Sequence, residues 1–293
     1  MDKLVYYITV FFIRLFGLLP FPAIYKISDF LSFVLFYIIK YRRTVVYKNL
    51  KMCFPEKSEK EIWDIERKNY TNLSDLVVES MKGFSMDFND ISKRYRIANP
   101  EILDPYFEEG KSVIVFLNHF ANWEWGKFCA QLGFKHHPVL FYKPLANKYI
   151  DQYLGKSRGN MDLQLVSYHE VQQTIDEHVN EACMYILVGD QSPSNIQKAI
   201  WADFFNIETA CVHGPEKYAV QTAYPILFAN VQRVKRGSYE LTAKLLFENA
   251  SGTAKGEVTQ VYMKELEEMI RKTPENWLWS HKRWKHKRIY DQK

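Results

Sequence analysis

The pattern of apolar and polar positions along the 293-residue chain predicts an α/β fold. Residues 112–118 (SVIVFLN) form a continuous apolar run rich in β-branched side chains, which is typical of a strand buried on both faces of a sheet. The predicted strands are residues 112–118, 139–142, 163–167, 184–188 and 225–230, and the predicted helices are residues 59–83, 102–109, 123–132, 148–158, 170–179 and 215–222. Strands that alternate with helices predict a mostly parallel central sheet flanked by helices.

Two later segments complete the predicted core. Residues 239–247 alternate between apolar and polar side chains, which indicates an antiparallel strand near the sheet edge. Residues 258–272 have the spacing of an amphipathic helix. Near the start of the core, Ser58 and Glu61 form a capping-box pattern for the long helix that follows. We therefore expect residues 44–293 to form a single α/β domain.

The N-terminus is apolar in a different way. Residues 4–19 contain one charged side chain and residues 24–39 contain two, so neither stretch offers the roughly 20 uninterrupted apolar residues of an ordinary membrane-spanning helix. We expect residues 1–43 to form membrane-associated helices that lie in a bilayer or partly enter it. A pair of helices buried in a soluble core is the alternative.

Charge and composition support a membrane surface more than a nucleic acid. The formal net charge is +5, and basic side chains gather in residues 40–51 and 281–288, neither of which contains an acid. Such segments are usually solvated faces, and the alternative is contact with the phosphates of a lipid or a nucleic acid. The aromatic fraction of 16% suits a membrane interface. No recognisable nucleic-acid motif is present, so we do not expect a nucleic-acid partner.

The segment that follows the first predicted strand carries the candidate chemistry. It reads N-H-F-A-N-W-E and places His119 five positions before Glu124. On one straight helix these two side chains would face about 140° apart. They converge if His119 lies in a turn and Glu124 lies in the first turns of a helix that begins near Asn122, a favoured cap residue.

A histidine and a carboxylate in this arrangement favour general-base catalysis. A neutral imidazole near pH 7 takes a proton from an alcohol that attacks a thioester. A carboxylate on the other ring nitrogen fixes the tautomer and stabilises the imidazolium that forms. His119 is therefore the candidate base and Glu124 its candidate partner. The alternative is a histidine hydrogen-bonded at a strand end, with Glu124 solvated on its helix.

Other catalytic chemistries find little support. The G-x-S-x-G elbow of a serine nucleophile is missing from the sequence. The remaining candidate ligands His136, His137, His169 and His213 do not show the H-E-x-x-H spacing of a zinc site. We expect neither a metal ion nor a cofactor.

The block L-N-H-F-A-N-W-E-W-G resembles the H-x₄-(D/E) block of the late (lauroyl and myristoyl) acyltransferases of lipid A biosynthesis. Three further segments, residues 187–206, 210–219 and 277–285, resemble later blocks of the same family in the same order. Together the four blocks cover roughly residues 110–290. The departures are Asn206 in place of a family glycine, His213 in place of a threonine, and Lys143-Pro144 in place of a fuller R-P element.

The resemblance implies a function, partners and site residues. The donor would be an acyl carrier protein thioester. The acceptor would be a hydroxyl of a phosphorylated glycolipid, at the cytoplasmic face of the inner membrane. His119 would be the base and Glu124 its partner. The implied substrate-binding residues are Asn122, Trp123, Arg158, Asp190, Gln191, His281 and Arg283.

Two alternatives to this function remain. One is an acyltransferase that acts on a lysophospholipid or another hydroxy-lipid. The other is a catalytically silent membrane scaffold with the same fold.

Overall fold

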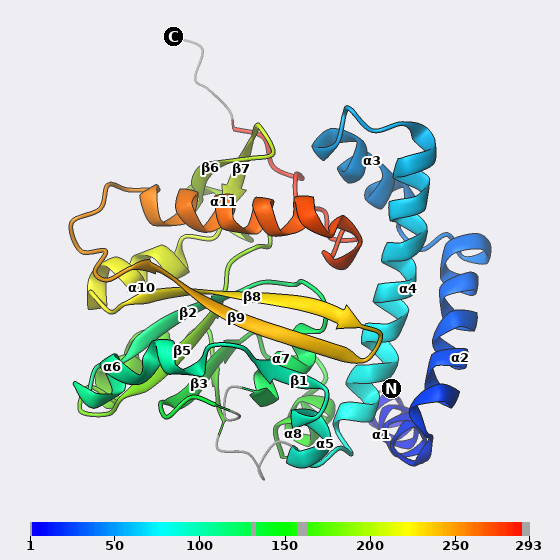
Figure 1. Cartoon of the computed structure of the whole chain (residues 1–293), viewed down its shortest axis with the longest axis horizontal. Coiled ribbons are helices and arrows are strands. Elements are labelled where there is room, and N and C mark those ends of the chain that lie inside the picture. Colours follow the sequence, from blue (N-terminus) through cyan, green and yellow to red (C-terminus); the bar gives the residue numbers. More distant parts are fainter. Residues whose placement is uncertain (1, 130–132, 157–162, 289–293) are drawn as a thin grey trace.

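The computed structural model describes residues 2–129, 133–156 and 163–288 (Figure 1). Within these residues, seven strands form one sheet in the order β1-β9-β8-β2-β5-β3-β4. The strands are β1 (Tyr95–Ile97), β2 (Val113–Leu117), β3 (His137–Tyr142), β4 (Gln164–Ser167), β5 (Cys183–Val188), β8 (Ile226–Lys235) and β9 (Ser238–Phe247). The neighbouring strands run parallel except for β8 and β9, which are antiparallel. The predicted mostly parallel sheet and its antiparallel strand near the edge are both confirmed.

Helices cover both faces of the sheet, as predicted. Alternate side chains of β2 point to opposite faces, so Ile114 and Phe116 enter one core while Val113 and Leu117 enter the other. Figure 1 shows α11 on one side of the sheet and α6 and α7 on the other. The helices of the sheet layers are α5 (Phe88–Ser92), α6 (Asp104–Glu108), α7 (Trp123–Cys129), α8 (Lys148–Lys156), α9 (Val171–Glu177), α10 (Gly214–Thr222) and α11 (Glu257–Lys272).

A long helix, α4 (Glu59–Gly83), separates this layered core from the N-terminal helices. Its predicted start is confirmed, because Ser58 and Glu61 form the complete capping box. Helices α1 (Asp2–Leu18) and α2 (Phe21–Phe33) pack against α4, and α2 continues as a π-helical turn, Val34–Ile38.

The outer faces of these N-terminal helices are apolar and exposed. Tyr7 and Phe11 on α1 are 65% and 61% exposed, and Phe30 on α2 is 68% exposed. Among the described residues, Phe21–Ile38 is the one helical stretch whose length and composition would let it cross a membrane, and 22% of it is buried in the fold. Large apolar surfaces without a protein cover are typical of membrane-binding proteins.

Several elements were not predicted. Helix α3 (Arg43–Cys53) overlaps the first basic segment. Strands β6 (Ile200–Phe204) and β7 (Ile207–Cys211) form a separate antiparallel hairpin. Its turn residues, Phe205 and Asn206, have φ angles of 59° and 57°. Asparagine tolerates this left-handed region, which explains how Asn206 stands where the family has glycine. Single 3₁₀ turns lie at Pro100–Leu103, Ile196–Lys198 and Pro274–Asn276.

Candidate active site

The register of two parallel strands brings the candidate base to a carboxylate. Strands β2 and β5 are neighbours, and Leu117 pairs with Val188 at their carboxyl ends. Two residues further along each strand lie His119 and Asp190. The carboxyl edge of such a sheet is where ligands bind in α/β proteins. The sheet itself therefore positions these two side chains next to each other.

Asp190 holds His119 through both the ring and the backbone. The His119 Nδ1 atom lies 2.6 Å from Asp190 Oδ1, and the His119 backbone N–H donates to Asp190 Oδ2 at 2.9 Å. The indole N–H of Trp277 also donates to Oδ2, at 2.9 Å. The Asp190 side chain is 1% exposed and the His119 side chain 22% exposed. The carboxylate is thus fully enclosed, and the imidazole remains open on one side.

The charges of this pair stabilise each other. Burial by itself lowers the pKa of His119, but the charge and hydrogen bond of Asp190 and the charge of Glu124 outweigh it, so the pKa is raised overall. Burial by itself raises the pKa of Asp190. The charge and hydrogen bonds of His119, together with the Trp277 N–H, nevertheless lower the pKa of Asp190 to about 2. Asp190 is therefore ionised across the physiological range.

The open ring nitrogen of His119 has the chemistry of a base. Because Nδ1 faces a carboxylate, the neutral ring carries its proton there and its lone pair on Nε2. The side-chain nitrogen of Gln191 lies 3.2 Å from Nε2 and donates to it in this tautomer. The Trp123 ring packs against the imidazole edge to face, with 5.1 Å between ring centres. A substrate hydroxyl at Nε2 would replace the Gln191 contact.

Glu124 does not occupy the place that the sequence analysis gave it. The carboxylate bonded to Nδ1 is Asp190, because the strand register sets it beside His119, whereas Glu124 lies in the first turn of α7. Glu124 acts on His119 through its charge, which raises the pKa of the imidazole. The tautomer-fixing contact therefore comes from a residue that the family resemblance had assigned to substrate binding.

The turn between β2 and α7 is anchored by the C-terminal segment. The Ala121 N–H donates to the Asn276 carbonyl at 2.9 Å, and the Leu278 N–H donates to the His119 carbonyl at 3.2 Å. These bonds form a short antiparallel bridge on either side of Phe120 and Trp277. Ala121 adopts a positive φ of 52°, which allows the chain to reverse before the helix begins.

Asn122 begins the helix, as predicted. Its Oδ1 accepts from the Trp125 backbone N–H at 2.9 Å, which is the N-cap contact. Its Nδ2 donates to Glu79 Oε2 at 2.7 Å, and its side chain is buried. Asn122 therefore shapes the turn from inside the protein. Neither Glu79 nor Trp277 had been assigned a role in the site.

His281 and Arg283, two of the residues expected to bind substrate, form hydrogen bonds within the protein. His281 Nε2 accepts from the Ser192 N–H at 3.1 Å, and burial lowers the pKa of His281 to about 4, so this ring is neutral. Arg283 is 1% exposed and donates to the Ala210 carbonyl and the Cys211 sulfur. A neutral imidazole and a buried guanidinium are poorly suited to bind a phosphate, so we leave both out of the acceptor site. Arg158 lies outside the described residues.

The two basic segments of the sequence lie side by side. Arg42 Nη1 donates to the Ser280 carbonyl at 3.1 Å. Asn49 on α3 donates to the carbonyls of Trp279 and His281, both at 2.9 Å. The exposed lysines of the two segments are Lys40, Lys48, Lys282, Lys285 and Lys287. Segments more than 200 positions apart thus contribute to one basic surface near the site.

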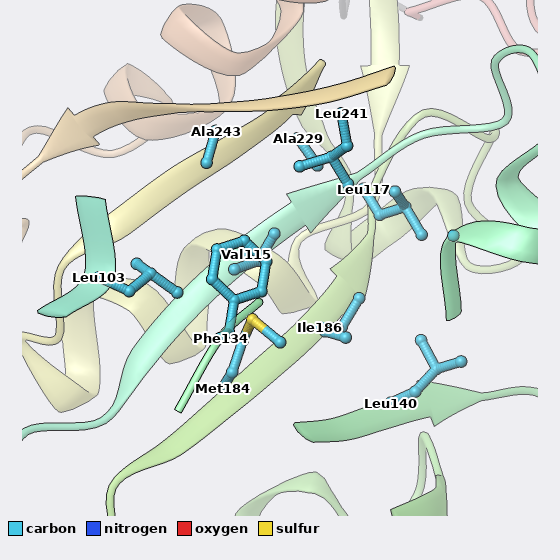
Figure 2. Close-up of a pocket in the computed structure, with 11 residues that line it drawn as sticks. Leu103, Val115, Leu117, Phe134, Leu140, Met184, Ile186, Ala229, Leu241 and Ala243 are labelled. Atoms are coloured by element: carbon cyan, nitrogen blue, oxygen red, sulfur yellow. The ribbon is translucent and has the colours of Figure 1, made fainter. Parts of the chain in front are cut away.

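An apolar cavity lies beneath the catalytic turn, on the face of the sheet covered by α7 (Figure 2). Leu117, two positions before His119, lines it from β2, and Gly126, two positions after Glu124, lines it from α7. Met184 and Ile186 of β5 line it as well. Every side chain labelled in Figure 2 is apolar. The volume of the cavity is about 30 Å³, well below the roughly 300–1,000 Å³ of a ligand pocket. The described residues contain no cluster of three or more histidine, cysteine or acidic side chains that could hold a metal ion.

A buried carboxylate that orients an open histidine, at the carboxyl edge of an α/β sheet, is an arrangement typical of enzyme sites that abstract a proton. Comparison with known proteins gives the family. The model of the family described as bacterial lipid A biosynthesis acyltransferase matches residues 1–286. The chain therefore belongs to that family and is an O-acyltransferase.

Two relatives show the extent of the similarity. The lipid A biosynthesis lauroyltransferase of Escherichia coli (strain K12) is 24% identical over 273 residues, which cover 91% of this chain and 87% of that protein. The lipid A biosynthesis palmitoleoyltransferase of the same organism is 20% identical over 270 residues, which cover 91% and 86%. The similarity therefore includes the N-terminal helices as well as the α/β core.

Proposed function

We propose that this protein transfers a fatty acyl group from an acyl carrier protein thioester to a hydroxyl of a phosphorylated lipid A precursor. The observation that carries the proposal is the His119–Asp190 pair, which directs the Nε2 lone pair toward the open side of the site. The lauroyltransferase and palmitoleoyltransferase relatives support the choice of substrate class.

The reaction needs one base and no covalent enzyme intermediate. Nε2 of His119 takes the proton of the acceptor hydroxyl while that oxygen bonds to the thioester carbonyl carbon. The carbon–sulfur bond then breaks, and the imidazolium returns the proton to the sulfur. The products are the new ester and the free thiol of the carrier. Asp190 and Glu124 stabilise the imidazolium in between, because both carboxylates raise the pKa of His119.

The apolar cavity offers a route for the acyl chain, but its volume of about 30 Å³ means that it must widen to admit the chain. The cavity begins next to the catalytic turn and extends along β2 and β5. An acyl chain that lies there places its carbonyl carbon toward His119. Burying each methylene stabilises the complex by about 0.8 kcal/mol, which offsets part of the cost of widening the cavity.

The acceptor and the membrane are proposed to meet the protein on its basic and apolar surfaces. The joined basic segments supply lysines for the acceptor phosphates, next to the site. We propose that residues 1–43 associate with the inner membrane through the exposed apolar faces of α1 and α2, and that the catalytic core of residues 44–293 faces the cytoplasm.

Acyl transfer by the purified full-length protein tests the function. The protein is incubated with carrier-protein thioesters of several chain lengths and a tetra-acylated lipid A precursor, and the lipids are read by mass spectrometry. We expect the precursor to gain one acyl mass. His119→Ala should lower the rate by about 10³-fold or more, because the base contributes roughly 10²–10⁴-fold.

A second histidine provides the matched control. His178 is also hydrogen-bonded and half-buried. It stacks on His137 at the start of β3, where the amino ends of the strands lie, whereas His119 follows the carboxyl end of β2. His178→Ala should retain the wild-type rate. Transfer to a lysophospholipid but not to the precursor would refute the proposed acceptor. Failure of every acceptor would refute the enzymatic proposal as a whole.

The cavity is tested by filling it. Ala243, buried on β9, lines the cavity. Ala243→Leu should shift the preference toward shorter acyl donors, by about tenfold in the ratio of kcat/KM for short over long chains. Ala202→Leu, at an equally buried alanine on β6 outside the cavity, controls for overpacking and should leave the ratio unchanged. An unchanged ratio in Ala243→Leu would exclude the cavity as the acyl site.

A further inference from the structure

A second buried carboxylate contacts the last residue of the catalytic turn, Asn122. Glu79 on α4 is fully buried. Its Oε2 accepts from Asn122 Nδ2 at 2.7 Å and from the Tyr239 hydroxyl at 2.6 Å, and its Oε1 accepts from the Tyr25 hydroxyl at 2.8 Å. The Trp125 indole N–H donates to the Glu79 carbonyl at 2.9 Å. Glu79 therefore accepts hydrogen bonds from Asn122, at the end of the turn, and from Trp125, in the helix that follows.

These contacts join four separate parts of the chain. Tyr25 belongs to α2, the candidate membrane helix, and Tyr239 belongs to β9. Asn122 and Trp125 start α7, which also carries Glu124. A carboxylate that accepts from all of these donors fixes the Asn122 amide, and the Asn122 oxygen in turn caps α7. The position of the His119 turn therefore depends on how α2 packs against α4.

We propose that Glu79 is a positioning residue for acyl transfer, which holds the Asn122 amide and thereby sets the geometry of the His119 turn and of Glu124. The proposal rests on the acyltransferase function given above. Glu79 touches neither the base nor the space for substrate, and it acts through Asn122. A shift of about 1 Å at a reacting group costs on the order of 10²-fold in rate, so a loosened turn is enough to impair catalysis.

The chemistry of the contacts predicts which substitution is tolerated. Glutamine at position 79 can keep its amide oxygen on Asn122 and Tyr239 while its amide nitrogen donates to the Tyr25 hydroxyl. Leucine fills a similar volume but accepts no hydrogen bond, and it leaves the Asn122 amide buried without a partner. Glu79→Leu should therefore impair the turn, and Glu79→Gln should largely rescue it.

The experiment compares these variants in the full-length protein on two readouts. The first is kcat and KM for acyl transfer. The second is hydrogen exchange of the backbone amides of residues 118–126, followed by mass spectrometry, which does not depend on activity. We expect Glu79→Leu to lower kcat by about tenfold or more, to leave KM within about twofold, and to speed exchange in this segment. Glu79→Gln should stay within about threefold of the wild-type kcat.

A glutamate on the same helix supplies the matched control. Glu66 is also buried on α4 and pairs with Arg43 at 3.0 Å, away from the turn. Glu66→Leu should lower thermal stability without changing kcat or the exchange of residues 118–126. Equal loss of kcat in Glu66→Leu and Glu79→Leu at equal loss of stability would overturn the positioning role.

A further variant keeps the test open if Glu79→Leu does not fold. Asn122→Ser retains a favoured N-cap side chain but removes the amide that reaches Glu79. It should reproduce the loss of kcat and the faster exchange. Wild-type kcat and exchange in Asn122→Ser would overturn the proposal. If the wild-type protein itself transfers no acyl group, the proposed function fails, and the exchange data still decide whether Glu79 holds the turn.

Discussion

The two carboxylates that flank the catalytic turn are equally buried but behave in opposite ways. Asp190 contacts a histidine, whose charge and hydrogen bonds lower the pKa of the carboxyl to about 2 despite burial. Glu79 contacts two tyrosines and an asparagine, and burial raises its pKa although the tyrosine hydroxyls oppose the shift. Burial disfavours the charge of both groups, and the partners decide in which direction each pKa moves.

This difference separates two tasks at one turn. Asp190 contacts the imidazole of His119, and its charge raises the pKa of that ring. Glu79 accepts hydrogen bonds from neutral donors, and the charges of Asp75 and Arg233 shift its pKa in opposite directions. Substitutions at Asp190 should therefore change the chemistry of His119, and substitutions around Glu79 should change geometry. Four predictions test this division, beginning with the largest effect.

Asp190→Asn should lower kcat by about 10³-fold or more. An asparagine can present its amide nitrogen to Nδ1, which favours the tautomer with the proton on Nε2 and removes the base. Steady-state acyl transfer measures the effect. Asp203→Asn, at an exposed aspartate on β6, is the control and should leave kcat unchanged. A loss below tenfold in Asp190→Asn would contradict the role given to this carboxylate.

Trp277→Phe should lower kcat by about tenfold. The substitution removes the indole N–H that Asp190 Oδ2 accepts, and a hydrogen bond to a charged group contributes about 1.5–3 kcal/mol. Trp279→Phe is the matched control, because Trp279 is equally buried and donates to the Pro274 carbonyl. If both variants lose the same activity, the effect comes from packing and not from Asp190.

The pH dependence of kcat/KM should differ between wild type and Asp190→Asn. Activity requires neutral His119, so the rate rises with pH through the pKa of the imidazole. In the wild type that pKa is raised, so the midpoint should lie above the ordinary histidine value of about 6.5. Without the Asp190 charge, burial dominates and the midpoint of the residual activity should move to lower pH. A midpoint that stays in place would show that Asp190 does not set the pKa.

The smallest effect concerns stability. Folding raises the pKa of the Glu79 carboxyl, so this group is more protonated in the folded state than in the unfolded state. The contribution of the carboxyl to the free energy of unfolding therefore falls as the pH rises above the pKa of the unfolded state. The wild type should therefore lose unfolding free energy relative to Glu79→Gln as the pH rises above the ordinary carboxyl pKa of 4.5, measured by urea titration. For Asp190, whose pKa is lowered, the sign is reversed, and stability is lost as pH falls toward about 2. A parallel pH dependence of wild type and Glu79→Gln would contradict the raised pKa.

Much of the fold and the candidate base followed from the sequence alone. The apolar runs indicated the five main parallel strands, and the capping box marked the start of α4. The L-N-H-F-A-N-W-E-W-G block identified His119, and the asparagine in it was recognised as a helix cap. These features are local, because strand periodicity, caps and motifs are encoded in neighbouring residues.

The partners of His119 were decided by the tertiary structure. Asp190 lies 71 positions away, and Trp277 reaches it from the C-terminal segment. Only the register of β2 against β5 brings Asp190 to the imidazole, and no local pattern encodes that register. No feature of the sequence marked Glu79 as a residue of the site, because a glutamate on a long helix usually points to solvent. The sequence thus indicated most of the main elements and the candidate base. The packing of strands and helices decided which carboxylate orients that base and which one holds its turn, because long-range contacts form only when distant segments pack together.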